Sequence, residues 1–290
     1  MGEHLLDLAA ATLRLATPLL LAAMGGLLSE RSGIINLALE GKMLVGAFAA
    51  AVVTLATGSP WLGLAGGSLA GILLAALYGV AVLPLKANQI VAATGINMLA
   101  AGIPPFVAKI LYNVTGSTPS IELAHRFVVF PMGLALVAPV ALWWVLGKTR
   151  AGLRLNFAGE HPEALAAAGV SVARVRWTAL LAAGALAGSG GASLSIFLSS
   201  AYSRNMSSGR GFMALAALIL GKWRPLPTLF ACLFFAVADA VQIRLQGLEI
   251  AGLGKVPVQF IQILPYVLTI IVLAGFVGKS RAPKALGEPL

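Results

Sequence analysis

The stretch AAGALAGSGGAS, residues 182–193, lies inside an apolar run that extends from residue 173 to residue 198. As a helix, a run of that length crosses the hydrocarbon core of a bilayer, which is about 30 Å thick. Its alanine, glycine and serine side chains are small, and small side chains let helix backbones approach one another closely in lipid. The stretch therefore predicts a membrane-spanning helix that packs tightly against other helices.

Apolar runs of similar length recur along the whole chain. The predicted spans are 5–28, 36–57, 61–84, 89–111, 127–147, 173–198, 209–222, 225–247 and 258–278. The run 209–222 covers only about 21 Å as a helix, so it is either a tilted short span or a half-helix buried among its neighbours. We expect an all-α polytopic membrane protein of about nine transmembrane helices, within a range of about eight to ten, in a single domain over residues 1–290.

The composition agrees with a membrane protein. Hydrophobic residues make up 59% of the chain and charged residues 10%, whereas soluble domains carry about 25% charged residues. A soluble all-α protein is the alternative, but so many runs of spanning length argue against it. The net charge of +10 would suggest nucleic acid in a soluble protein. Here it collects in short loops, which indicates membrane orientation and no nucleic-acid partner.

Three basic segments set the predicted orientation. They are the loop 148–176, the turn 221–224 and the tail 279–284. All three lie on one side of the membrane if the run 209–222 counts as a crossing, and the positive-inside rule makes that side cytoplasmic. We therefore expect a cytoplasmic C-terminus and an N-terminus on the opposite side.

The sequence carries no motif for catalysis, for a cofactor or for a metal. The three histidines, His4, His125 and His161, have no cysteine or carboxylate at a metal-ligand spacing. The chain contains no GxxxxGK[ST] motif for ATP and no nucleophile elbow. Its single cysteine, Cys232, excludes a disulfide within the chain. We expect a protein that is not an enzyme.

Asp239 is the deepest ionisable residue in a predicted span, and Arg244 follows it closely. Asp239 belongs either to a proton or cation relay, or it pairs with a polar neighbour or borders an aqueous pathway. We favour the second interpretation, because proton-coupled carriers usually show several such acids in relay. Glu40 lies at the head of a predicted helix, where the positive end of the helix dipole favours it, and its expected role is capping.

Two pairs of segments indicate a faint internal repeat. LEGKMLVGAFAAAV (39–52) is similar to GRGFMALAALILGK (209–222), and GSPWLGLAGGSLAG (58–71) is similar to GKWRPLPTLFACLF (221–234). The two halves are offset by an odd number of spans, so they would lie in opposite orientations. Inverted repeats of this kind build the two-sided pathways of many transporters.

A half-polar segment, GEHPEALAAAGVSVARVRW (159–177), separates two apolar runs. Pro162 suits the first turn of a helix, and Glu163 complements the positive end of its dipole. The letters EALAAAG then provide about two turns of strong helix formers, which Gly169 ends. This short exposed helix is either a knob for a groove on another protein or a surface helix at the headgroups.

Four motifs occur in the order expected of one family. They are SERSGIINLALEGKMLVGAFAA (29–50), GEHPEALAAAGVSVARVRW (159–177), AAGALAGSGGASLS (182–195) and GRGFMALAALILGKWRPL (209–226), followed by GKSRAPKALGEP (278–289). Together they resemble the shorter permease of the nucleoside and simple-sugar uptake group, in the branched-chain amino acid and ribose permease superfamily of ABC importers. The segment 159–177 is similar to the coupling-helix loop of such permeases.

The resemblance implies the permease subunit of a type II-like, ATP-driven importer in the bacterial cell membrane. Its implied partners are an ATPase with two nucleotide-binding domains in one chain, a second, longer permease and an extracytoplasmic solute-binding lipoprotein. Nucleosides come first as the implied solute, with simple sugars and riboflavin-like compounds behind them. The implied ATPase-coupling helix comprises Gly159, Glu160, Pro162, Glu163, Ala164, Ala167 and Gly169.

The candidates for the pathway or its gate are Asn36, Glu40, Asn97, Arg204 and Asp239. We expect the polar loop 199–209, which contains Arg204, to face the pathway mouth or the lipoprotein, or else to be a simple connector. Two other functions remain open. One is a stand-alone ion-coupled secondary transporter with Asp239 as its coupling acid, and the other is a membrane scaffold without a transport role. An importer subunit requires partner subunits and a docking helix, and a carrier requires neither.

Overall fold

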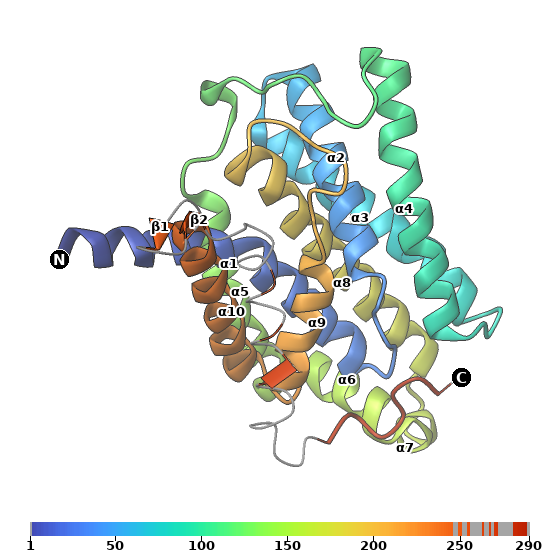
Figure 1. The fold of residues 1–290 in the computed structure, drawn as a ribbon. Helices are drawn as coiled ribbons and strands as arrows, with labels where there is room; N and C mark the ends of the chain where they lie inside the picture. Colours follow the sequence, from blue (N-terminus) through green and yellow to red (C-terminus); the bar gives the residue numbers. More distant parts are fainter. Residues whose placement is uncertain are drawn as a thin grey trace.

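The computed structural model describes residues 2–245, 249–250, 254–255, 263, 267, 270–271 and 281–288. The described chain is built of helices (Figure 1). They are α1 (Gly2–Arg31), α2 (Leu39–Thr57), α3 (Pro60–Val82), α4 (Gln89–Tyr112), α5 (Phe130–Lys148), α6 (Arg150–Glu160), α7 (Pro162–Ala167), α8 (Val172–Ser193), α9 (Arg210–Leu220) and α10 (Pro225–Leu245). Short helical turns cover Leu123–His125 and Leu194–Leu198, and β1 (Glu249–Ile250) pairs antiparallel with β2 (Gly254–Lys255).

The predicted membrane-spanning helices are confirmed over the described residues. Seven helices there are long and apolar enough to cross a membrane, and α9 is a shorter apolar helix. The predicted span 36–57 starts later, at Leu39, because residues 32–38 form a non-helical segment. The predicted span 258–278 lies almost entirely outside the described residues. A separate helix that the sequence analysis did not predict, α6, follows α5 where the Thr149 hydroxyl accepts from Gly152 N at 3.1 Å.

Small residues hold the centre of the bundle together, as the stretch 182–193 predicts. Helix α8 packs against α1, α2 and α3 (Figure 1). A Cβ atom added to Gly71 of α3 would lie 2.2 Å from the carbonyl oxygen of Gly184 in α8. A Cβ atom on Gly46 of α2 would lie 2.5 Å from the carbonyl oxygen of Gly188. Only glycine permits these two backbone contacts, since real Cβ atoms do not approach so closely.

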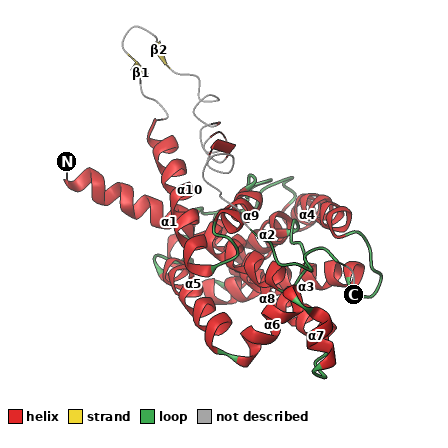
Figure 2. Cartoon of the chain, turned by 90° about the horizontal axis from the view of Figure 1, so that it is seen from below, coloured by secondary structure: helices red, strands yellow, loops and turns green. Residues whose placement is uncertain are grey.

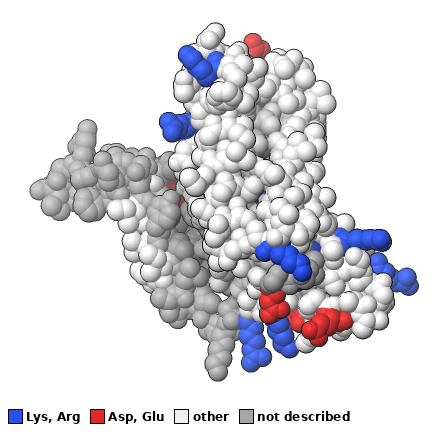
Figure 3. Space-filling model, turned by 90° about the vertical axis from the view of Figure 1, so that its right-hand side faces the viewer, with Lys and Arg blue, Asp and Glu red and all other residues white. Residues whose placement is uncertain are grey.

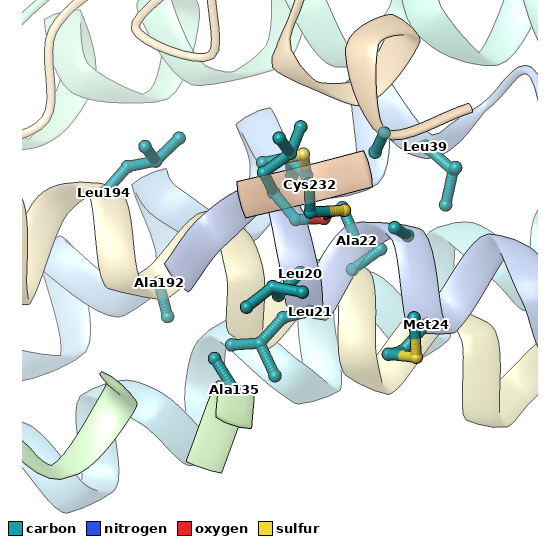
Figure 4. Packing of buried hydrophobic residues seen from close by; sticks show 14 of the residues in the cluster. Leu20, Leu21, Ala22, Met24, Leu39, Ala135, Ala192, Leu194 and Cys232 are labelled. Carbon is teal, nitrogen blue, oxygen red and sulfur yellow. Dashed lines mark hydrogen bonds between the residues drawn. The ribbon is translucent and has the colours of Figure 1, made fainter. Parts of the chain in front are cut away.

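A second part of the core lies between α1 and α10. Cys232 of α10 is completely buried and lies among apolar side chains that include Leu20, Leu21 and Met24 of α1 (Figure 4). The outer faces of α3, α4 and α5 carry exposed large apolar side chains, among them Met98 and Phe106. This distribution is typical of a bundle whose outer surface contacts lipid.

Helix α9 is a half-helix, one of the two alternatives for the run 209–222. Its 11 residues extend about 16 Å, roughly half of a hydrocarbon core. Figure 1 shows the segment 199–209 entering the bundle before α9 begins. Within this segment Tyr202 and Ser207 are completely buried, and Ser203 forms an isolated β-bridge with Ser117. This arrangement agrees with the prediction that the run 209–222 belongs to one crossing, which stays a prediction.

The described basic segments gather on one end of the bundle. A cavity of about 570 Å³ is lined by residues of both the turn 221–224 and the α5–α6 junction, including Arg224 and Gly147. The tail reaches the same end, because Lys284 Nζ lies 3.4 Å from His161 Nε2. Figure 3 shows a broad uncharged band between the charged ends of the molecule. This is the arrangement that the predicted orientation requires, and we name this face the basic face.

Candidate functional site

Glu40 joins the starts of two helices. It is the second residue of α2, yet its carboxylate accepts from the backbone N–H groups of Gly209 at 2.8 Å and Gly211 at 2.7 Å. These groups belong to the start of α9, whose N-cap residue Gly209 has no side chain to cap the helix. The predicted capping role of Glu40 therefore applies to α9, across the bundle.

The physical reason is the position of α9. Its first N–H groups have no partner within the helix, and inside a membrane protein no bulk water replaces one. A carboxylate accepts hydrogen bonds from two of these donors, and its negative charge also interacts favourably with the positive end of the helix dipole. The two helices fit closely, because a Cβ atom on Gly211 would lie 2.4 Å from Glu40 N. We call the meeting point of α2 and α9 the junction.

The junction matches the predicted internal repeat. The repeat pairs residues 39–52 with 209–222, and these segments are the two helices that begin side by side at Glu40. Each helix follows a non-helical segment, 32–38 before α2 and 199–209 before α9. Discontinuous helices whose N-termini meet inside the bilayer form the solute sites of many transporters. The junction is therefore the candidate pathway.

Two further pathway candidates, Asn36 and Asn97, lie at the start of α2. Asn97 Oδ1 accepts from Gly41 N at 2.9 Å, and its Nδ2 donates to the Leu37 carbonyl at 2.9 Å. Asn36 Oδ1 accepts from Lys42 Nζ, while Asn36 Nδ2 is buried without a partner in the described part of the chain. The structure thus brings Asn36, Glu40 and Asn97 together and leaves a free amide donor beside them.

Arg204 and Asp239 lie apart from this group. Arg204 is exposed, and its backbone N–H donates to the Gly116 carbonyl at 2.6 Å, within the pairing of the two loops. Asp239 of α10 is half-buried and interacts electrostatically with Arg210, the first residue of α9. The pairing of Asp239 with a polar neighbour stays a prediction.

Two buried charged residues beside the segment that leads into α2 were not among the predicted pathway candidates. Lys42 is completely buried, and its Nζ lies 5.1 Å above the centroid of the Tyr78 ring. Glu30, at the end of α1, accepts from Trp223 Nε1 at 2.6 Å and from Asn36 N at 3.5 Å. Both lie within the motif 29–50. This motif carries more charged residues than is usual in an apolar region, and that excess was the sequence signal for buried charges.

The candidate coupling helix α7 stands on the basic face. It begins at Pro162 and is followed by Gly169, which has a φ of +77°. Leu165 is buried against Ala158 and Val172 and anchors the helix. The side chains that remain exposed belong to Glu163, Ala164, Ala166, Ala167 and Ala168. A low, mostly apolar surface of this kind fits a groove on another protein.

Arg176 of α8 connects that helix to three other segments of the chain. It is 1% exposed, and its guanidinium donates to the carbonyls of Ser32 at 3.0 Å, Glu288 at 2.9 Å and Ala158 at 3.5 Å. One side chain thus ties α8 to the α1–α2 segment, to α6 and to the C-terminal tail. The sequence analysis counted Arg176 only as a loop charge. Arg174 has the same charge but is exposed, because residues two apart face different sides of a helix.

The C-terminal tail, residues 281–288, completes this connection. Ala285 N donates to the Gly159 carbonyl at 2.8 Å, and Gly287 N donates to the Gly33 carbonyl at 3.0 Å. Figures 1 and 2 both place the tail beside α6 and α7. Gly159 is required here, because a Cβ atom on it would lie 2.2 Å from the Arg31 carbonyl oxygen. A continuous series of contacts therefore runs from α7 through the tail and residues 32–38 to the junction.

Comparison with known families gives one match that covers most of the chain. Residues 8–273 match the sequence model described as the permease component of the branched-chain amino acid transport system. No solved structure matches the chain significantly.

Several characterised proteins are similar over nearly their whole length. The nucleoside ABC transporter permease protein NupC of Lactococcus lactis is 37% identical, over 94% of this chain and 92% of that protein. The guanosine ABC transporter permease protein NupQ of Bacillus subtilis is 35% identical, over 96% and 94%. The putative glucose ABC transporter permease protein TsgC13 of Haloferax volcanii is 34% identical, over 94% and 92%.

A second permease of Bacillus subtilis is also similar. The guanosine ABC transporter permease protein NupP is 27% identical, over 72% of this chain but only 66% of its own longer chain. This chain is therefore similar to two different permease proteins of one organism and covers more of the shorter one.

Removal of the Glu40 carboxylate should destabilise the junction. Glu40→Ala leaves two N–H groups without an acceptor, and one orphaned buried donor costs about 1–3 kcal/mol. We expect a thermal unfolding midpoint several degrees below that of the parent protein. Glu40→Gln keeps one acceptor oxygen and should give an intermediate value.

Glu122→Ala is the control, because it removes the same charge from an exposed position. The comparison requires each variant in the same detergent, with the midpoint read from intrinsic fluorescence. A midpoint for Glu40→Ala equal to that of Glu122→Ala would show that the carboxylate does not hold the junction.

Proposed function

We infer the function from one premise: the chain belongs to the family of permease components of branched-chain amino acid transport systems. It is a multi-pass membrane protein with several apolar helices of spanning length. We propose that it is the permease subunit of an ATP-driven importer and forms the translocation pathway for nucleosides or related sugar-containing solutes. The names of its relatives, two of them nucleoside or guanosine permeases and one a glucose permease, support this solute class.

The observation that carries the proposal is the exposed face of α7. The helix stands on the basic face, its small side chains are exposed, and Leu165 fixes it to α6 and α8. In the proposed mechanism this face seats in a groove of an ATPase, and movement of the ATPase pushes α7. The push reaches α2 and α9 through the tail, Arg176 and residues 32–38. This subunit itself carries out no chemical step, and its partner hydrolyses ATP.

The proposed partners are those that the family resemblance implies. An ATPase, with two nucleotide-binding domains in one chain, binds the basic face. A second, longer permease completes the pathway, and the similarity of this chain to both NupQ and NupP supports such a pair. A solute-binding lipoprotein delivers the ligand at the opposite face, where loop 199–209 pairs with residues 116–121. The location is the bacterial cell membrane, with a cytoplasmic C-terminus.

The junction suits a solute that passes through without tight binding. Its buried Asn36 amide nitrogen has no partner in the described part of the chain, whereas the buried Glu40 carboxylate already has two partners. Selectivity then belongs mainly to the lipoprotein. The alternative of a stand-alone ion-coupled carrier is not favoured, because the relatives are subunits of ABC transporters and Asp239 interacts with Arg210.

The orientation is tested by thiol labelling in intact cells. Cys232→Ala removes the buried native thiol, and single cysteines then replace Arg154, Lys284 or Ser203. Arg154 and Lys284 lie on the basic face, so impermeant reagents should not label them until the cells are opened. Ser203 is exposed on the opposite face and should be labelled from outside. Labelling of Lys284→Cys in intact cells would contradict the cytoplasmic C-terminus.

The docking role of α7 is tested by two substitutions. Ala167→Glu introduces a charge into the proposed interface, and an unpaired buried charge costs about 3–5 kcal/mol, so co-purified ATPase should fall at least about tenfold. Gly169→Val places a β-branched residue at a φ of +77° and should displace the end of α7. Both variants should lose solute uptake and ATPase stimulation while reaching the membrane at normal levels.

Ala87→Glu is the matched control for Ala167→Glu. Ala87 is exposed in the connection between α3 and α4, away from α7, and its variant should bind the ATPase and transport normally. If Ala167→Glu and Gly169→Val retain the ATPase and normal uptake, α7 is only a surface helix and the proposed function loses its main support.

A further inference from the structure

A groove beside α7 takes no part in the contacts described so far. It has a volume of about 510 Å³ and lies between the end of α5, α6 and the start of α8, with Leu28 of α1 at its back. Its walls are mainly apolar, and the apolar lining residues include Val145, Leu155, Val175 and Ala182. The connection between α7 and α8, residues 169–171, forms part of its rim.

The groove crosses the boundary of the membrane. The apolar spans that flank it end at Lys148 and begin at Val172. Ala182 lies ten residues into the second span, about 15 Å below its start. Trp143 and Trp144, near the end of α5, are exposed, and exposed tryptophans mark the headgroup level of a membrane protein. The apolar floor is therefore within the hydrocarbon, and the rim is at the headgroups.

The charged residues that line the groove are both arginines. Arg154 comes from α6 and Arg174 from the first turn of α8, and both are exposed at the rim. A guanidinium binds phosphate through two parallel hydrogen bonds. An apolar channel that starts in the bilayer and opens between two arginines matches the two parts of an anionic phospholipid, its acyl chain and its phosphate.

A soluble protein does not fit the groove equally well. A partner that docks from the aqueous side meets α7 and the rim, but the exposed lining residues Thr178 and Ala182 belong to the apolar span, at the depth of the lipid. We propose that the groove is a binding site for an anionic phospholipid, with its phosphate at Arg154 and Arg174 and an acyl chain along Val175 and Ala182. Because residues 169–171 line the rim, the bound lipid steadies the end of α7.

This inference goes beyond the proposed function and does not rest on it. The test measures lipid retained by the full chain in phosphatidylcholine nanodiscs that contain a minor fraction of phosphatidylglycerol. Native mass spectrometry of the protein released from the discs counts each lipid. We expect the parent protein to retain phosphatidylglycerol in preference to phosphatidylcholine.

The double variant Arg154→Gln/Arg174→Gln should weaken retention of phosphatidylglycerol roughly thirtyfold, from the contribution of two basic residues near the membrane surface. Lys148→Gln/Arg150→Gln is the matched control. It removes the same charge from exposed positions on the same face that do not line the groove, and it should retain the lipid. Ala182→Phe fills the apolar floor, keeps both arginines, and should also lose the lipid.

Three results would overturn the proposal. Equal losses in the two double variants would mean general attraction of anionic lipid to a basic surface. Full retention by Ala182→Phe would show that no acyl chain lies in the groove. A cysteine at Thr178 that crosslinks to another protein subunit in native membranes would show that protein covers the groove. None of these readouts measures ATPase binding or solute uptake. Failure of the lipid proposal would therefore leave the proposed function untouched, and the reverse is also true.

Discussion

The structure depends on how it satisfies the backbone of a broken helix inside a membrane. A helix that starts within the bundle exposes N–H groups that neither lipid nor bulk water can pair. The Glu40 carboxylate accepts hydrogen bonds from two such groups, Gly209 N and Gly211 N, and thereby fixes the start of α9 beside the start of α2. The position of the non-helical segments on either side follows from this contact. An opening between two helix starts is also the feature through which a solute could pass.

The need to pair buried backbone groups also explains the contacts of residues 32–38, at the α7 end of the series of contacts. Residues 32–38 are non-helical and buried, so their carbonyls need donors, and Arg176 and Gly287 supply them at Ser32 and Gly33. Close packing makes this arrangement rigid, because glycine contacts such as that of Gly71 with Gly184 leave no room between α3 and α8. A rigid bundle with two fixed connections, Arg176 and Glu40, can carry a displacement of α7 to the junction.

Much of this architecture could be predicted from the sequence. Apolar runs located the spans, and Pro162 and Gly169 gave the bounds of α7, because each of these signals is local. The short run 209–222 left two alternatives, which only the bundle decides. Contacts between residues far apart in the sequence could not be predicted. No local pattern shows that Glu40 caps α9 instead of its own helix, or that Arg176 is buried while Arg174 is exposed. Asn36 and Asn97 were identified as candidates, but their partners were not.

We propose that Arg176 transmits movement of α7 to the pathway through its contacts with α6, the tail and Ser32, and the variant Arg176→Lys tests this role. Lysine keeps the charge but loses the planar fork that reaches three carbonyls. With Arg150→Lys as the exposed control, uptake and ATP hydrolysis are measured on the complex that co-purifies with each variant. We expect that Arg176→Lys retains its ATPase and continues to hydrolyse ATP while uptake falls roughly tenfold, as the loss of a coupling contact implies. Normal uptake by Arg176→Lys would show that Arg176 does not couple α7 to the pathway.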